Sequence, residues 1–177
     1  MQVEFNCYQA TIQDIEPGVF FAAAVGGETT FCLSVQPDSA QTAPNLLTLW
    51  PGHPGLKNKI GLLNGSVISG QPILVYPEAK IVPSPNSRHL RLDPFRSTPV
   101  GSLLIKENEF FIQAATGNGS KAYSCRNGAA STASVAPFTS VLFASWEIMI
   151  AGPGGEPHTL CVIDVTVDES HPVDIFS

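Results

Sequence analysis

The chain has 177 residues, of which 44% are hydrophobic and 14% charged, and its formal net charge is −6. This length and hydrophobic content exclude a disordered chain and suffice for one domain that folds around a core without disulfides or metals. The acidic balance argues against general nucleic-acid binding, because neutralising phosphates requires a basic face.

Short β-prone runs separated by turn residues occupy the first half of the chain. The 15 glycines and 15 prolines of the whole chain leave no long window for a helix, so helix is expected only as a short turn within residues 39–47 or 56–63. Gly26-Gly27-Glu28 predicts a compact hairpin, and Asn64-Gly65 predicts a turn. The expected strands cover residues 2–12, 19–25, 29–35, 46–50, 66–77 and 79–83.

The second half repeats the same pattern and contains the strongest strand signals. Residues 106–109 predict a second hairpin, and the Gly-rich residues 152–158 predict a third. Strands are expected at 102–105, 110–116, 121–125, 140–151 and 159–167. Alternation predicts one apolar face in each of the last two, formed by Leu142, Ala144, Trp146, Ile148 and Ile150 and by Cys161, Ile163, Val165 and Val167.

These patterns predict an all-β fold, an antiparallel β-sandwich or barrel of roughly 10–12 short strands. We expect a single domain over residues 1–177. If the chain has two halves, the Pro-rich residues 83–100 are where they divide.

Charge is distributed unevenly and is sparse compared with the roughly 25% of an ordinary soluble domain. Residues 53–96 carry six Lys or Arg and two acids, whereas residues 1–52 carry five acids and residues 146–177 six, with no Lys or Arg in either end. The sparse charge favours a homo-oligomer whose surface is partly buried between copies, although extracellular β-domains with neutral polar surfaces look similar. The basic middle is expected to lie beside acidic ends, within one chain or between two.

The four cysteines, Cys7, Cys32, Cys125 and Cys161, are widely spaced and form no Cys-x-x-Cys pair. Such spacing predicts no zinc site, and we expect neither a metal nor a cofactor. The first residues lack a basic start and an apolar run, and no stretch approaches the ~20 apolar residues of a membrane span. We therefore expect a cytoplasmic protein without membrane contact, whose thiols are reduced and mostly buried.

The first candidate site is a Pro-flanked segment that holds three of the four arginines: Arg88, His89, Arg91 and Arg96. Its charges suit an anionic ligand such as a carboxylate or phosphate, or an acidic segment of a partner. His89 and Asp93 would stand roughly 13 Å apart on an extended strand, which is too far for a catalytic pair. The alternative is a solvated strand, or one that contacts the acids of a neighbouring subunit.

The second candidate site is Trp50-Pro-Gly-His53-Pro-Gly, in which a rigid loop would display both side chains. Trp50 could stack on a sugar and His53 could act as a base or metal ligand. The alternative is a strand-end Trp that closes the core, followed by a tight loop.

No nucleophile elbow, dinucleotide fingerprint, Walker loop or zincin motif is present. The sequence therefore predicts a non-enzymatic, self-associating structural or binding β-domain with an anion-binding patch around Arg88–Arg96. Two alternatives stay open. One is a small cofactor-free hydrolase or isomerase with a His–carboxylate site in a closed pocket. The other is a secreted carbohydrate-binding module that uses Trp50, Tyr76 or Trp146 and has paired cysteines.

Overall fold

The computed structural model describes residues 6–37, 43–52, 60–84, 98–131, 141–152 and 154–165. Within these stretches the regular elements are thirteen strands and two short 3-10 helices, η1 (Ile12–Asp14) and η3 (Gly65–Ile68). The predicted all-β fold is confirmed, with one strand more than the upper end of the expected range.

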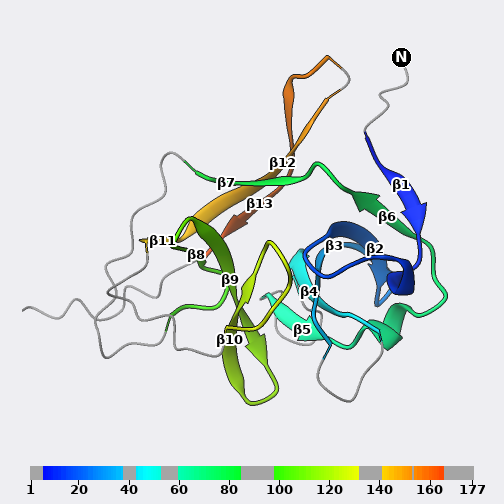
Figure 1. Ribbon diagram of the computed structural model, residues 1–177, viewed down its shortest axis with the longest axis horizontal. Coiled ribbons are helices and arrows are strands. Elements are labelled where there is room, and N and C mark those ends of the chain that lie inside the picture. Colours follow the sequence, from blue (N-terminus) through cyan, green and yellow to red (C-terminus); the bar gives the residue numbers. More distant parts are fainter. Residues whose placement is uncertain are drawn as a thin grey trace, which may run out of the picture.

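Ten strands form one large sheet. They are β1 (Tyr8–Ala10), β2 (Phe20–Val25), β3 (Glu28–Val35), β4 (Asn45–Trp50), β5 (Gly61–Leu63), β6 (Ile73–Tyr76), β8 (Leu103–Lys106), β9 (Glu109–Thr116), β10 (Gly119–Ser124) and β11 (Val141–Phe143). The order is β1-β6-β2-β3-β4-β5-β9-β8-β11, and β10 pairs with β9 (Figure 1). Neighbours are antiparallel except β5 and β9, which meet in parallel at Gly61 and Ala115.

A second sheet contains β7 (Lys80–Pro83), β12 (Ser145–Ala151) and β13 (Pro157–Asp164), in the order β13-β12-β7. The chain passes from the large to the small sheet at the turn after Tyr76 and again at Ala144. The β12–β13 hairpin projects beyond the rest of the described chain (Figure 1).

Two of the predicted hairpins close with two-residue turns. The β2–β3 turn has Gly26 and Gly27 at φ 62° and 90°, and the β8–β9 turn has Glu107 and Asn108 at φ 50° and 69°. Two consecutive positive φ angles identify type I′ turns, whose twist matches that of the strands they join. Glu107 adopts this conformation without the freedom of glycine, so the β8–β9 turn carries some backbone strain.

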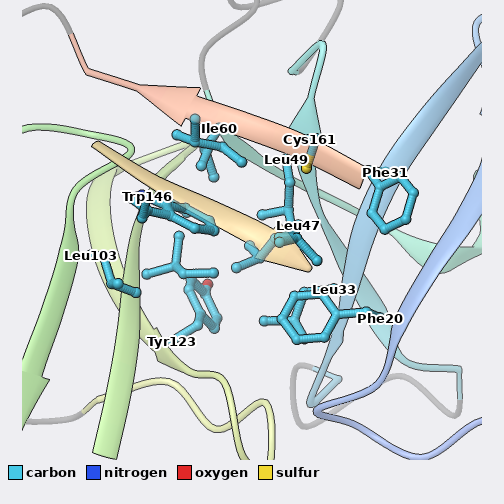
Figure 2. Close-up of a cluster of buried hydrophobic side chains, with 14 of the residues drawn as sticks. Phe20, Phe31, Leu33, Leu47, Leu49, Ile60, Leu103, Tyr123, Trp146 and Cys161 are labelled. Atoms are coloured by element: carbon cyan, nitrogen blue, oxygen red, sulfur yellow. The ribbon is translucent and has the colours of Figure 1, made fainter. Parts of the chain in front are cut away.

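The main core lies between the two sheets (Figure 2). Trp146 of β12 is fully buried there, and its indole N–H donates a hydrogen bond of 2.8 Å to the carbonyl of Gly101, the second residue before β8. This bond links the small sheet to the large one. The buried members are Phe20, Ala22, Phe31, Leu33, Val35, Leu47, Leu49, Ile60, Leu103, Ile112, Ala114, Tyr123, Trp146, Ile148, Cys161 and Ile163.

A second core covers the opposite face of the large sheet, where Ile12 of η1 and Ile68 of η3 are fully buried. Its buried members are Ile12, Ile15, Phe21, Ala23, Val25, Cys32, Leu46, Ile68, Ile73 and Val75. Strands β2, β3 and β4 therefore lie between two cores, and their nearly continuous apolar runs are buried on both faces.

Three sequence predictions need correction. Residues 66–72 are not strand, because Asn64 caps η3 by accepting a hydrogen bond from the Ser66 backbone N–H through its side-chain oxygen. The described parts of 39–47 and 56–63 contain strand rather than the expected helical turn. The predicted strand 140–151 is divided at Ala144 between the two sheets, although its apolar face is buried as expected. The single domain over residues 1–177 stays a prediction.

Candidate functional site

Most of the predicted site residues, namely Arg88, His89, Arg91, Arg96 and His53, lie outside the described residues. The segment that carries the arginines connects β7 of the small sheet to β8 of the large sheet. At its start, the Ser84 backbone N–H donates a hydrogen bond of 3.1 Å to the carbonyl of Ser145. This bond holds the last described residue before the basic segment beside β12.

Trp50, the described member of the predicted site, ends β4 with 52% of its surface exposed. Its cross-strand partner is Phe31, whose ring lies 5.2 Å from that of Tyr76. Trp50 therefore displays its ring next to the buried Phe31 and the half-buried Tyr76, and it does not close the core. Trp146, by contrast, is fully buried and cannot stack on a ligand.

The free edges of the sheets differ in how well they are protected from pairing with another strand. β1 and β11 are three residues long, and β7 carries Lys80 and Pro83. On β10, the chain that follows returns along the strand, where Tyr123 bridges to Ala130 and the Ser131 N–H donates to the Ala122 carbonyl. Short length, Lys, Pro and a covering segment are all known protections of edge strands.

β13 lacks most of these protections. It has eight residues, no Lys or Arg, and its one proline is the first residue, Pro157. Among the described residues it pairs with β12 alone. A β-bulge at Leu160 divides the ladder into one segment from Cys161 to Asp164 and a shorter one from Pro157 to Thr159. An exposed edge of this kind is a template for another strand.

The hydrogen-bond pattern shows which backbone groups of β13 face the open edge. The Val165 N–H donates to the Ala144 carbonyl at 2.8 Å, and in an antiparallel ladder residues that bond to the partner alternate with residues that do not. Every second residue before Val165 does the same, so the backbone N–H and C=O groups of Ile163 and Cys161 also point at β12. Val162 and Asp164 therefore direct their N–H and C=O groups outward.

The outer face of the small sheet, turned away from the core, bears a row of three cross-strand neighbours. Val82 of β7 and Val162 of β13 flank Glu147 of β12, and their exposed fractions are 37% and 50%. The Glu147 carboxylate accepts hydrogen bonds from the hydroxyls of Thr159 at 3.0 Å and Ser84 at 3.5 Å. The two exposed valines and the hydrogen-bonded carboxylate form a partly apolar, partly acidic surface that could contact another protein.

The described residues contain no group of three or more His, Cys, Asp or Glu side chains that could hold a metal ion. All four cysteines are free thiols, and Cys32 and Cys161 are buried. Burial raises the pKa of Cys161 to about 12 and that of Cys32 further, so both are protonated at neutral pH. A protonated, buried thiol is a poor nucleophile, which assigns these two cysteines to the core.

The open β13 edge was not singled out by the sequence analysis. Two signals were available: the β-branched residues Thr159, Val162 and Ile163, and the lack of Lys within the strand. What the sequence could not show is which strands end the sheets.

No family model, no curated protein and no solved structure matches this chain. No helix in the described stretches has the length and apolar character that a membrane crossing requires.

Proposed function

We propose that this chain is a non-enzymatic, self-associating β-domain, a building block whose copies meet along the β13 edge. The observation that carries the proposal is the outward-facing backbone of Val162 and Asp164 on an edge without Lys, Arg or internal Pro. Each unpaired N–H and C=O on such an edge can bond to a second strand, and main-chain bonds give β-addition its affinity.

The sparse charge of the chain supports this proposal. Only 14% of residues are charged, and residues at the centre of subunit contacts are poor in charge. Val162, half exposed on the edge strand itself, would become buried in the contact. Burying it removes apolar surface from water, worth up to about 1 kcal/mol per subunit for the exposed half of a valine side chain.

The basic segment belongs to the same proposal as a second contact. It begins beside Ser84 on the small sheet and carries three of the four arginines of the chain. The last 32 residues, 146–177, hold six acids and no Lys or Arg. We propose that Arg88, His89, Arg91 and Arg96 bind an acidic segment of another copy or a small anion. Such contacts weaken as salt rises, whereas the apolar and main-chain contacts of β13 do not.

The free thiols support a reducing compartment, and we propose the cytoplasm. The carbohydrate-binding alternative rests on paired cysteines and an aromatic platform. Of its three candidate rings Trp50 is exposed, Tyr76 lies against Phe31, and Trp146 is buried.

Light scattering over a wide protein concentration range tests the proposal. We expect the wild type to show a multiple of 18.8 kDa and Val162→Lys to show a single chain, because a lysine on the edge opposes strand addition. Val67→Lys is the matched control: Val67 is also 50% exposed but lies on η3. A wild type that stays at 18.8 kDa throughout, or two variants with the same mass, would contradict the proposal.

The same assay at low and high salt, with Arg88→Ala/Arg91→Ala, separates the two contacts. A mass that falls with salt and with the arginine changes places the basic segment in the contact. If neither salt nor the arginine changes alter the mass, the β13 contact alone accounts for the assembly. The arginines are then available for an anionic ligand.

A further inference from the structure

We infer that β13 pairs antiparallel with β13 of a second copy, about a twofold axis that passes between the two Val162 residues. This inference rests on the proposed self-association and specifies its register.

The backbone limits the choice of register. After the bulge at Leu160, the outward-facing residues of β13 are Val162 and Asp164. In a twofold antiparallel pair, hydrogen bonds form where outward-facing residues lie opposite each other. Within the segment from Cys161 to Asp164, the axis can therefore lie at Val162, at Asp164, or at Ile163, where Val162 of one copy would face Asp164 of the other.

Side-chain chemistry separates these three registers. An axis at Asp164 places two carboxylates directly opposite each other, which is destabilising. An axis at Ile163 sets each Asp164 against the half-exposed Val162 of the other copy, so the carboxylates lose water without gaining a partner. An axis at Val162 brings the two valines together and separates the carboxylates by four residues. Each Asp164 then lies opposite Leu160 of the other copy, where the bulge interrupts the strand, and so stands at the end of the contact.

The Val162 register also continues the layers of the fold. On the inner face Cys161, 6% exposed, would lie opposite Ile163 of the second copy, 7% exposed, which extends the buried row. On the outer face the two Val82–Glu147–Val162 rows would join across a six-stranded sheet. The bulge at Leu160 interrupts β13 two residues from the axis, so the uninterrupted part of the contact is short.

We infer that the strand paired with the β13 edge comes from a second copy of this chain, because the edge is self-complementary in this register. A twofold contact requires one patch to match itself, and here the residue on the axis is apolar while the one acidic residue of the strand lies away from it. A strand of an unrelated protein would need no such symmetry at Val162. A wild type that stays monomeric would favour that case.

Disulfide trapping tests the register. In the Val162 register the two Cα atoms at this position are about 5.5 Å apart, within disulfide range, whereas the two Asp164 Cα atoms are roughly 13 Å apart and cannot be bridged. We expect Val162→Cys to convert most of its monomer band into a disulfide dimer under mild oxidation. Asp164→Cys and the equally exposed control Val67→Cys should stay monomeric on a non-reducing gel, as should the wild type with its native cysteines.

The outcomes separate the register from the self-association. If light scattering shows an assembly but Asp164→Cys cross-links instead of Val162→Cys, the register is overturned and the self-association stands. If the assembly forms and neither variant cross-links, β13 is not the contact and the register is again overturned. If the wild type is a monomer at every concentration, the proposed function fails and the register fails with it. Far-UV circular dichroism of each variant confirms that it is folded.

Discussion

Replacing Trp146 by Phe tests the contact that links the two sheets. The indole N–H of Trp146 donates to the Gly101 carbonyl at 2.8 Å, and the side chain is fully buried. Phenylalanine has no donor, so the buried carbonyl loses its partner at a cost of about 1–3 kcal/mol. The smaller ring leaves a cavity of roughly 40 Å³, which at about 24 cal/mol per Å³ adds about 1 kcal/mol. The expected loss of unfolding free energy is therefore about 2–4 kcal/mol.

The assay is thermal unfolding followed by far-UV circular dichroism at one fixed protein concentration. For a chain of this length each kcal/mol lowers Tm by about 2–4 °C, so Trp146→Phe should lower it by about 10 °C. Trp50→Phe is the matched control, because the same atoms are removed from a side chain that is 52% exposed, and it should cost less than about 0.5 kcal/mol. Equal losses in the two variants would refute the claim that the indole bond links the sheets.

Three further changes follow from the backbone and the thiols. Glu107→Asn should raise the free energy of unfolding, measured by urea titration, by about 0.5–1 kcal/mol, because asparagine tolerates the positive φ of 50° better than glutamate does. An unchanged or lower free energy of unfolding would show that the turn is not strained. Gly65→Ala should cost more than about 2 kcal/mol, since its Cβ would lie 2.0 Å from the Pro44 carbonyl oxygen, whereas Gly117→Ala meets open space and should be nearly neutral in the same urea titration. The raised pKa of Cys161 means that the native thiol keeps its proton while the unfolded thiol loses it. This thiol should therefore contribute a fall in stability of about 1.4 kcal/mol per pH unit as pH rises above about 8.5, in addition to the fall that the buried Cys32 contributes. Cys161→Ala should make that fall shallower between pH 8.5 and 10, and an identical slope in both proteins would argue against the raised pKa.

Local chemistry was enough to predict most strands and their turns. Gly26-Gly27 and Glu107-Asn108 each separate two β-prone runs, and a two-residue turn between such runs determines the pairing of its neighbours. The alternation from Leu142 to Ile150 identified a buried face because successive side chains of a strand point to opposite sides. The error at residues 66–72 has a local cause too: Asn64 is a helix cap, and this signal was taken as a turn before a strand.

The candidate site was less predictable, since it depends on which strand lies at an edge. Composition marked the arginine segment and Trp50, and the exposure of Trp50 agrees with its proposed display. β13 shares its length, its β-branched residues and its lack of Lys with the central strand β3, so these signals mark a strand without marking an edge. Among the described strands, β3 lies between two cores and β13 ends its sheet.

The sequence by itself determined the all-β class, the hairpin turns and the side of each late strand that faces the core. These features depend on the backbone preferences of a few neighbouring residues and on a period of two. Only the tertiary structure decided that the run from Val141 to Ala151 bends at Ala144 into a second sheet, that Trp146 reaches Gly101, and that β13 ends its sheet. Those outcomes depend on contacts between residues far apart in the chain, which the local pattern does not contain.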